Sequence, residues 1–516
     1  MTEPLSLPVF RKISRIVDGM GLRAYVIGGY VRDYYLCRPC TDIDVVVVGS
    51  GIDVAEALAR ETGSNVTVFK TFGTAMLRTE GMEVEFVGAR KESYSRDSRK
   101  PVVEAGTLRD DQLRRDFTIN ALAWSLNGDT FGELEDPFGG MEDMREHIIR
   151  TPCDPDITFS DDPLRMMRAV RFAAQLGFDI APETFEAIER NRERIRIVSR
   201  ERIITEINKI VLSPVPSIGF ELMDMTGLLP LVFPEMSRLK GVEKVGLHGH
   251  KDNFTHTLKV LDNVALNSDS LWLRWAAILH DIGKPATKAY DPAAGWTFHG
   301  HEVVGARMVP DIFRRMKLPL NDRMKYVRKL VLLHLRPQIL SDDVVTDSAV
   351  RRLLFEAGDD IDDLMTLCEA DITSGDERKV KRYLKNFAVV RRKLREIEEK
   401  DRVRNFQPPV SGELIMETYG IPPCRIVGEI KDEIKEAILD GRIANDYGQA
   451  YAMMEELAAR HGLKRRAAAW AETKANGAEQ RLFRPVAIVG AVVSESQTDR
   501  EAHGSEAERC VQLGVA

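Results

Sequence analysis

The chain has 516 residues, of which 44% are hydrophobic, 30% charged and 7% aromatic, and its net charge is -7. Its length exceeds the usual size of one hydrophobic core and predicts three or more domains. The composition is typical of a soluble globular protein. No apolar run approaches the roughly 20 residues of a membrane span, and the N-terminus does not look like a signal peptide. We therefore expect a cytoplasmic protein without a membrane partner.

The net negative charge argues against a protein that coats nucleic acid indiscriminately, although a local basic face is compatible with it. The six cysteines include one close pair, Cys37 and Cys40 in CRPC, and no second CxxC completes a zinc site. These two cysteines are expected in a loop, in a reducing compartment.

Strand-like and helical stretches alternate near the N-terminus. Within residues 22–136 the strand-like runs are RAYVIGG, DIDVVVV, NVTVFK, TAMLRT and MEVEFVGAR. From about residue 140, amphipathic helical patterns replace them. The predicted fold class is therefore α+β multidomain, with a mixed-sheet head that carries helices, followed by a mostly helical remainder.

Proline-containing breaks at residues 230–236 and 405–412 divide the helical part. The expected domains are a head at 1–145, a helical neck at 146–235, a helical body at 236–400 and a helical tail at 401–465. Residues 466–516 have no sustained periodicity and are rich in Ala, Gly, Ser and Glu, which predicts disorder. No internal repeat of fixed period occurs in the sequence.

The stretch GGYVRDYYLCRPCTDIDVVVVG, residues 28–49, places two acids at the start of an apolar strand. Side chains alternate along a strand, so Asp42 and Asp44 point the same way and repel each other unless a cation lies between them. A pair of Mg²⁺ ions is the simplest candidate. The alternative is a turn acid followed by a strand-start acid.

The residues before this strand favour the metal interpretation. Gly28 and Gly29 end the preceding strand, where missing side chains let backbone N–H groups approach a triphosphate. Arg32, one helical turn on, can reach a phosphate with its guanidinium group. Together these features predict a site for a metal-chelated nucleotide.

The stretch resembles the head of the DNA polymerase beta-type nucleotidyltransferases. Within them it is similar to the tRNA CCA-adding and bacterial poly(A) polymerase family, whose signature is GG-x-VRD followed by DxD. LRRDFTINALAW, residues 113–124, resembles the family's RRDFTxNAL motif. The resemblance implies that Arg115, Asp116 and Asn120 contact the phosphates and ribose of the nucleotide.

The alternative for this motif is an amphipathic helix with Phe117, Ile119 and Leu122 inward, which leaves the consecutive RRD unexplained.

SDDPLRMMRAVRFAAQLGF, residues 160–178, resembles the family's EDxxR motif with its trailing RxxRF. On a helix, Asp161, Asp162 and Arg165 share a face. A carboxylate and a guanidinium match the hydrogen-bonding edges of cytosine and adenine. The resemblance therefore implies that these residues and Arg168 bind the nucleotide and select CTP and ATP without a template.

Asp162 has a second interpretation, because an acid before Pro163 is also a favourable helix N-cap. Position 161 is usually Glu in the family, and the shorter Asp161 leaves Asp162 and Arg165 as the expected base-pairing residues.

The resemblance implies that the 3′-hydroxyl of a tRNA attacks the α-phosphate of CTP or ATP, and that pyrophosphate leaves. Two Mg²⁺ ions roughly 3.5–4 Å apart would supply most of the charge neutralisation. Glu85 is a candidate third carboxylate, although Glu83 shares its face of the strand.

Seven of the ten histidines lie between His248 and His334. Imidazole and carboxylate side chains suit a divalent transition metal or Mg²⁺, whose bound water becomes a nucleophile. The H...HD...D order resembles the HD superfamily, and the candidate ligands of a metal of unknown identity are His256, His280, Asp281, His301, His334 and Asp371. The resemblance implies a phosphatase or cyclic phosphodiesterase acting on RNA ends, or an HD domain whose metal site is unused.

The run RKVKRYLKNFAVVRRK, residues 378–393, holds eight basic residues in sixteen. It is either a solvated helix face or part of a surface that holds tRNA.

Three alternative functions stay open. A poly(A) polymerase of the same family characteristically carries G-R-R-F-x-L-x-H-V after the DxD strand, where this chain has TFGTAMLRTEGMEVEFV, and it is not expected to have an HD domain. An enzyme that adds only CC or only A is the second. The third, from another class, is an HD hydrolase whose head only binds RNA.

Overall fold

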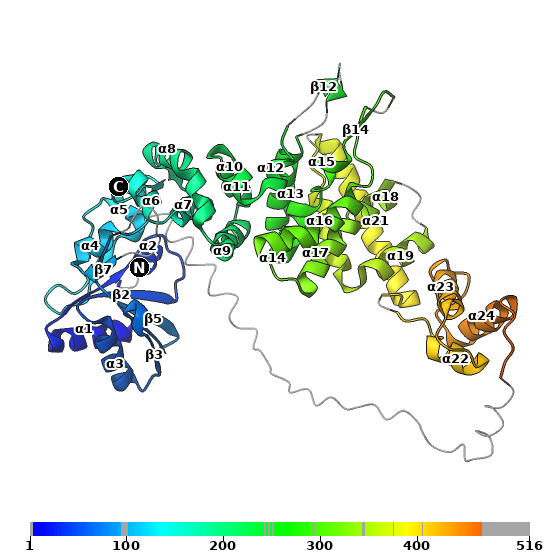
Figure 1. The fold of residues 1–516 in the computed structure, drawn as a ribbon, viewed down its shortest axis with the longest axis horizontal. Helices are drawn as coiled ribbons and strands as arrows, with labels where there is room; N and C mark the ends of the chain where they lie inside the picture. Colours follow the sequence, from blue (N-terminus) through cyan, green and yellow to red (C-terminus); the bar gives the residue numbers. More distant parts are fainter. Residues whose placement is uncertain are drawn as a thin grey trace, which may run out of the picture. The chain divides into compact units, whose positions relative to one another are not determined.

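The structure is a computed structural model, shown in Figure 1. It describes residues 4–93, 102–241, 244–245, 248–249, 252–293, 295–342, 346–374, 376–404 and 406–466. The chain divides into two compact units, Met1–Ser237 and a second unit that begins at Arg238. Apart from its first residue, the tail predicted at 466–516 lies outside the described residues. In the described part, no helix combines the length and the hydropathy that a membrane crossing requires.

The first unit opens with a seven-stranded mixed sheet of order β3-β4-β5-β2-β1-β8-β9. Only β2 and β5 run parallel to each other, and the other neighbours are antiparallel. The strands are β1 (Arg23–Ile27), β2 (Asp42–Val48), β3 (Val66–Phe69), β4 (Thr74–Thr79), β5 (Met82–Gly88), β8 (Ala123–Ser125) and β9 (Leu134–Glu135). The five predicted strand runs and the mixed sheet are confirmed.

Helices pack on this sheet because their apolar sides match its alternating buried positions. The helix α3 contacts β2, β4 and β5, and the Ser50 side chain caps its first turn by accepting from the Asp53 N–H. The helices are α1 (Pro8–Met20), α2 (Gly29–Tyr35), α3 (Gly51–Thr62), α4 (Leu108–Leu113) and α5 (Gly140–Arg145), with short 3₁₀ turns at η1 (Lys70–Phe72) and η2 (Thr118–Asn120). A separate ribbon pairs β6 (Arg90–Ser93) with β7 (Val102–Ala105).

The alternative of one amphipathic helix across residues 113–124 is wrong. The helix α4 ends at Leu113, and the turn η2 and the strand β8 follow it. Phe117, Ile119 and Leu122 are nevertheless fully buried. The buried residues were therefore identified correctly, and the helical period was not.

A helical segment completes the first unit. The main contacts join α7 to α9 and α10, and α6 to α8. Its elements are α6 (Pro155–Asp161), α7 (Leu164–Leu176), α8 (Pro182–Asn191), η3 (Arg192–Ile197), α9 (Arg200–Val211), α10 (Pro216–Met225), α11 (Leu229–Val232) and α12 (Pro234–Ser237), with β10 (Ile148–Ile149) parallel to β11 (Asp179–Ile180).

The second unit is almost entirely helical. Its helices are α13 (Asn253–Ala265), α14 (Leu271–Leu279), α15 (Lys284–Thr287), α16 (His301–Met316), α17 (Asp322–Leu333), α18 (Arg336–Asp342), α19 (Asp347–Ala357), η4 (Gly358–Asp360), α20 (Ile361–Ala370), α21 (Glu377–Asp401), α22 (Gly412–Tyr419), α23 (Arg425–Leu439) and α24 (Tyr447–Arg460). Two hairpins interrupt them, β12 (Lys244–Val245) with β13 (His248–Gly249) and β14 (Ala289–Asp291) with β15 (Gly295–Thr297). The α+β multidomain class is confirmed.

The longest of these helices, α21, spans 25 residues and begins at a side-chain cap. The Asp376 carboxylate accepts from the N–H groups of Arg378 and Lys379, which satisfies two of the unpaired donors of the first turn. Its buried residues Phe387, Val390, Leu394 and Ile397 recur at helical spacing. The basic run 378–393 therefore lies on an amphipathic helix that packs against α18, α19 and α20.

Candidate functional site

Asp42 and Asp44 lie at the start of β2, on the face opposite the buried Ile43 and Val45. Further along the strand this face continues as Val46, which packs with Ile27 and other apolar residues. Asp42 is exposed and Asp44 is half-buried. Burial raises the pKa of Asp44, Arg115 lowers it in part, and the charge of Asp42 raises it again. A cation beside these two carboxylates would relieve their repulsion, so the residues present fit a metal ion.

The parallel pairing of β2 with β5 brings two further acids to the same place. The register sets Asp42 beside Glu83 and Asp44 beside Glu85. Glu83 forms an ion pair with Arg78 at 2.7 Å. Loss of hydration and then the charge of Asp44 raise the pKa of Glu85. Glu85 is thus the acid that lies beside Asp44, and its role as a third metal-binding carboxylate stays a prediction.

Gly28 gives the site its space. Its backbone adopts φ 81° and ψ -126°, a conformation that side chains with a Cβ rarely take. A Cβ there would lie 2.7 Å from Arg115 Nη1, 3.5 Å from the Asn120 carbonyl oxygen and 3.7 Å from Asp44 Oδ2. The glycine therefore lets an arginine and an aspartate approach each other over the backbone. The Gly28 N–H donates to the Leu122 carbonyl at 3.1 Å, and the phosphate contact of the glycine turn stays a prediction.

Gly28→Ala is expected to lower the free energy of unfolding by about 1–3 kcal/mol, the usual cost of a strained backbone conformation. It should also weaken nucleotide transfer, since the new Cβ displaces Arg115. Gly19→Ala is the matched control, because nothing lies within 4 Å of a Cβ at that helical position. Urea unfolding of both variants measures the difference, and equal stabilities would contradict the role given to Gly28.

Four of the predicted nucleotide-binding residues form one hydrogen-bonded chain. Arg32 Nη1 donates to Asn120 Oδ1 at 2.7 Å, and Asn120 Nδ2 donates to Asp116 Oδ1 at 3.0 Å. Arg168 Nε on α7 donates to Asp116 Oδ2 at 2.6 Å. Arg32 also binds the Asp33 carboxylate through two hydrogen bonds of 2.9 Å. The network joins the glycine turn, the RRD motif and α7.

The electrostatics of Asp116 show how strongly this network is held. Burial alone would raise its pKa, but the charge of Arg168 and the hydrogen bond from Asn120 lower it from 3.8 to about 2. Asp116 is only 7% exposed, and Arg168 and Asn120 occupy its carboxylate. Asp116 is therefore placed to position its neighbours.

Arg168→Ala is expected to lower the free energy of unfolding by about 3 kcal/mol at neutral pH. This value is at the low end of the usual cost of breaking a buried ion pair, because Arg168 is partly exposed. A lowered folded-state pKa means that Asp116 contributes stability above pH 3.8 and loses it as the pH falls toward about 2. In the variant, the pKa of Asp116 loses the lowering that Arg168 supplies. Urea unfolding should therefore show a smaller difference between wild type and variant at about pH 3 than at neutral pH, and a pH-independent difference would contradict this account.

The expectation that Asp161, Asp162 and Arg165 share one helix face is wrong. The helix α6 ends at Asp161, Asp162 is extended, and α7 begins at Leu164. The break follows from Pro163, because a residue that precedes proline is disfavoured in the helical conformation. Asp162 Oδ1 accepts from the Leu164 N–H at 3.2 Å, as an N-terminal cap would.

Two contacts fix the proposed base-reading residues. Arg202 on α9 pairs with Asp162 at 2.7 Å, and Arg165 donates to the carbonyl of Arg114. The motifs of the sequence do not indicate Arg202, because it lies 40 positions from its partner.

Asp111 is the buried residue that the motif interpretation missed. It is fully buried, and its carboxylate accepts from Arg114 Nε at 3.0 Å and from Arg115 Nε at 3.3 Å. The spacing of three and four positions, from Asp111 on α4 to the two arginines just after this helix, is the signal that could have found it. Asp111 holds Arg115 toward Gly28 and Asp44.

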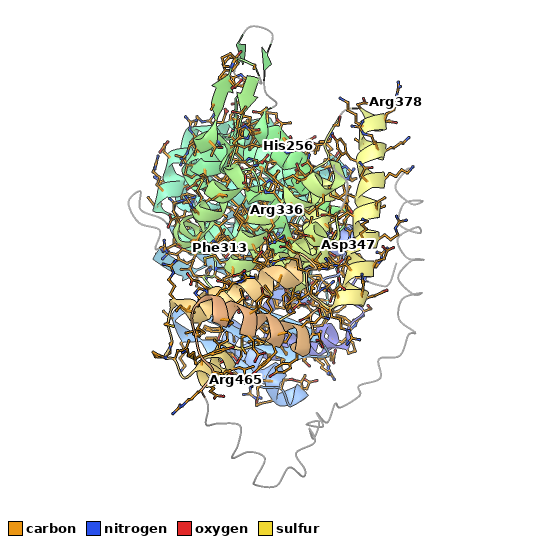
Figure 2. The ribbon with its side chains drawn as sticks, turned by 90° about the vertical axis from the view of Figure 1, so that its right-hand side faces the viewer. His256, Phe313, Arg336, Asp347, Arg378 and Arg465 are labelled. Atoms are coloured by element: carbon orange, nitrogen blue, oxygen red, sulfur yellow. The ribbon has the colours of Figure 1, made fainter. Side chains whose placement is uncertain are left out.

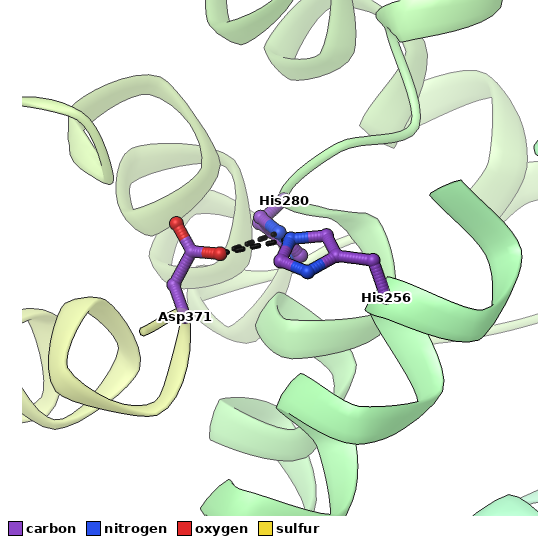
Figure 3. Close-up of side chains that lie close together, drawn as sticks. All are labelled: His256, His280 and Asp371. Carbon is purple, nitrogen blue, oxygen red and sulfur yellow. Dashed lines mark ion pairs between the residues drawn. The ribbon is translucent and has the colours of Figure 1, made fainter. Parts of the chain in front are cut away.

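The six predicted HD residues converge in the second unit. Their ligand atoms form two groups, each with all atoms within 4.8 Å of one another, namely His256 with His280 and Asp371, and Asp281 with His301 and His334. In the first group His256 Nε2 lies 2.9 Å from Asp371 Oδ1, and His280 Nε2 lies 3.6 Å from the same oxygen (Figure 3). No third group of this kind occurs among the residues that the structure describes.

Asp281 lies between the two groups. Its Oδ2 is 3.4 Å from His256 Nε2 and 3.3 Å from His280 Nε2. Its Oδ1 is 3.2 Å from His301 Nε2 and 3.9 Å from His334 Nε2. One carboxylate thus faces four imidazole nitrogens, as in a ligand shared by two metal ions.

The outer nitrogen of each ring is held by the surrounding backbone or by a hydroxyl. The Nδ1 atoms of three rings lie close to carbonyl oxygens, at 2.7 Å from Ala277 for His280, 2.8 Å from Phe298 for His301 and 2.7 Å from Val331 for His334. His256 Nδ1 lies 2.8 Å from the Thr373 hydroxyl. A carbonyl can only accept, so in His280, His301 and His334 Nδ1 carries the proton and Nε2 offers its lone pair to the centre.

The centre shows what a metal ion would satisfy. His280 Nε2 is buried and has no hydrogen-bond partner. Burial lowers the pKa of His280, but the charges of Asp281 and Asp371 outweigh it and raise it to about 10. Burial and then the charge of His280 lower the pKa of His334 to about 4. The two carboxylates that raise this pKa favour a positive charge at the centre, so the donors fit a divalent metal.

The CRPC cysteines lie between α2 and β2, and neither forms a disulfide within the part of the chain that the structure describes. This agrees with the loop prediction.

Three family profiles match the chain. They describe a "Poly A polymerase head domain" at residues 24–150, a "Probable RNA and SrmB- binding site of polymerase A" at 177–239 and an "HD domain" at 253–376.

Curated relatives and solved structures agree with these matches. A multifunctional CCA protein of Pseudomonas fluorescens is 36% identical over 311 residues, which are 58% of this chain and 71% of the relative. An A-adding tRNA nucleotidyltransferase of Deinococcus radiodurans is 33% identical over 347 residues, 65% of this chain and 76% of the relative. A crystal structure of the Bacillus stearothermophilus CCA-adding enzyme in complex with CTP aligns with a TM-score of 0.61 at 26% identity, over 88% of this chain and 99% of that one.

Proposed function

The chain belongs to the CCA-adding tRNA nucleotidyltransferase family, and we propose on that premise that it adds CCA to tRNA 3′ ends from CTP and ATP. The observation that carries the proposal is the convergence of Asp44 and Arg115 at Gly28, with Asp42 close enough to act on Asp44, where β1 ends and β2 begins. Such an enzyme would work in the cytoplasm, where tRNA is made in bacteria.

The acids of the sheet and Arg115 would have different roles in nucleotidyl transfer. Asp42 and Asp44 would hold Mg²⁺, with Glu85 as the candidate third ligand. Bound Mg²⁺ neutralises the charge on the triphosphate and on the reacting oxygens. Arg115, held by Asp111, is the cation nearest the pair and would contact the phosphates. The 3′-hydroxyl oxygen forms a bond to the α-phosphorus, the bond from that phosphorus to pyrophosphate breaks, and the hydroxyl proton leaves with solvent.

Base selection is assigned to Asp162 and Arg165, with Arg202 fixing the carboxylate. A carboxylate that already accepts from Leu164 and Arg202 has a defined direction. It can therefore favour a base that offers an exocyclic amine, as cytosine and adenine do.

The test is extension of a tRNA transcript that lacks its last three nucleotides, supplied with CTP, ATP or both. Addition of CCA and no more supports the proposal. Addition of A only to a transcript that already ends in CC identifies an A-adding enzyme, and addition of CC alone identifies a CC-adding enzyme. Extension without limit on ATP identifies a poly(A) polymerase.

A second function is favoured by the six converging ligands of the HD site. We propose that it binds two divalent ions that share Asp281 and that it hydrolyses phosphate esters at RNA ends. For a 2′,3′-cyclic phosphate, a water oxygen bonds to phosphorus, one P–O ester bond breaks and the released ribose oxygen takes the proton. The metal ions, when bound, supply the activated water.

The substrate would bind in the pocket beside this site. It has a volume of about 300 Å³ and is lined in part by His256, Asp281, His301, His334 and Asp371. Lys284 Nζ lies 2.5 Å from Asp281 Oδ2 and adds a positive charge at the rim. The metal ligands are therefore accessible to a small phosphate ester.

A further inference from the structure

One wall of the HD pocket comes from the helix α21, which supplies no predicted metal ligand. Tyr383 and Phe387 of this helix line the pocket together with the metal-binding residues. They stand four positions apart, so they lie on one face of α21. Phe387 is fully buried, whereas Tyr383 is only half-buried. Tyr383 therefore presents an aromatic ring to a pocket whose other end is the metal centre.

Basic residues surround Tyr383 on the same stretch of helix. Lys379 lies one turn before it, and the Arg382 guanidinium lies 5.2 Å from the centre of its ring. Arg378, Lys379, Arg382 and Lys385 are exposed, and no ion pair of theirs occurs within the described ranges. Figure 2 shows Arg378 at the end from which α21 starts.

The other half of α21 carries its basic residues differently. Arg391 pairs with Glu369 at 2.6 Å, Arg392 with Glu396 at 3.6 Å and Lys393 with Asp347 at 3.9 Å. Lys381 of the first half pairs with Glu377 at 3.9 Å, but the basic residues of the run without an ion pair in the described ranges all lie in the half that borders the pocket. A solvated helix face would not require this division, whereas a surface for phosphates would.

We propose that the first two turns of α21 guide a single-stranded RNA 3′ end into the HD pocket. The terminal base stacks on Tyr383, and the phosphates of the preceding nucleotides contact Lys379 and Arg382. This inference rests on the proposed hydrolase function of the HD site. Base stacking on an aromatic ring tolerates any base and suits an end whose sequence varies. A pocket of about 300 Å³ is at the small end of ligand sites and admits one nucleotide rather than a base pair.

The first arm of the test measures hydrolysis by the full chain with Mg²⁺ or Mn²⁺. The two substrates are adenosine 2′,3′-cyclic phosphate and methyl riboside 2′,3′-cyclic phosphate, which lacks the base. Tyr383→Ala should raise KM for the adenosine compound about 10-fold, the effect of one lost base stack, with kcat little changed. KM for the base-free compound should not move, and Tyr383→Phe should behave as wild type. Leu384→Ala, on an exposed neighbour outside the pocket lining, is the control.

The second arm measures binding of a short RNA, labelled with 2-aminopurine at its 3′ end, and needs no turnover. The double variant Lys379→Ala with Arg382→Ala should reduce the slope of log affinity against log salt by about 1.4, for two lost phosphate contacts. The double variant Arg392→Ala with Lys393→Ala removes the same charge from the other half of α21 and should leave the slope near that of wild type. Tyr383→Ala should abolish the quenching of 2-aminopurine that stacking causes.

The outcomes separate the two proposals. If wild type hydrolyses both compounds and Tyr383→Ala changes both KM values equally or neither, this inference is overturned and the hydrolase function stands. If wild type hydrolyses neither compound, the hydrolase function falls, and the binding arm decides the inference. Equal salt slopes for the two double variants, with unchanged quenching in Tyr383→Ala, overturn it.

Discussion

Asp44→Asn is expected to lower the rate of CCA addition by at least about 1,000-fold, which corresponds to about 4 kcal/mol of lost transition-state stabilisation. The substitution keeps the shape of the side chain and removes the charge that would hold Mg²⁺. Asp44 is the more buried acid of the pair, and it lies beside Arg115, which partly offsets its raised pKa. An uncharged amide at this place should leave the fold intact, because burial penalises the ionised form. The measurement is single-turnover extension of the tRNA transcript with saturating CTP and ATP.

Glu83→Gln is the matched control for this prediction. It removes one charge from the same face of the sheet, where Glu83 lies beside Asp42 and pairs with the exposed Arg78. Its effect should be less than about twofold, because surface ion pairs contribute little. Glu85→Gln tests whether Glu85 is a third metal ligand. If it is, the transfer rate of this variant should depend more strongly on the Mg²⁺ concentration than that of wild type. If Asp44→Asn retains wild-type transfer, the paired acids do not hold the catalytic metal.

Asp281→Asn is expected to lower hydrolysis at the HD site by at least about 100-fold and to reduce the bound divalent metal, while CCA addition continues. Asp281 faces all four imidazoles, so the loss of its charge affects both ligand groups. Loss of a single supporting contact of a metal ligand already costs about 10- to 100-fold, and loss of the shared ligand should cost at least the upper figure. Metal content by atomic emission, hydrolysis of a cyclic phosphate and tRNA extension are measured on one preparation.

Asp311→Asn is the control for Asp281, because Asp311 is an exposed acid on α16, the helix that begins at His301. It should keep both the metal and the hydrolysis. An Asp281→Asn chain that binds as much metal as wild type would exclude the shared-ligand arrangement. Loss of tRNA extension in the same variant would show that the substitution acts through folding and not through the HD site.

The sequence predicted those parts of the head whose secondary structure follows from patterns of neighbouring residues. The five strand runs could be recognised because alternation and β-branched residues are read from neighbouring positions. The order of the HD residues along the chain was likewise sufficient to identify candidate metal ligands, since all six lie close together in the structure. The domain boundaries and the individual roles of the nucleotide-binding residues stay predictions.

What the sequence could not show depends on partners that are distant in the chain. Arg32 was predicted to reach a phosphate, whereas its guanidinium binds Asn120, 88 positions away, and its neighbour Asp33. The sequence also does not show that the N–H of Gly28 donates to the Leu122 carbonyl, which lies 94 positions away along the chain. Arg202 fixes Asp162 from a different helix. Side chains that can donate to several acceptors are assigned only when the packing is known.

The contact between Asp116 and Arg168 also bears on how such chains can diverge. A change at position 168 leaves the buried Asp116 carboxylate uncompensated, and a change at position 116 leaves the partly exposed Arg168 without this partner, so selection should act against either. The two positions, 52 residues apart, are therefore expected to be inherited as a pair. A hybrid gene that joins the head of this chain to the neck of a distant relative should yield a stable product only when the donor supplies an arginine at position 168.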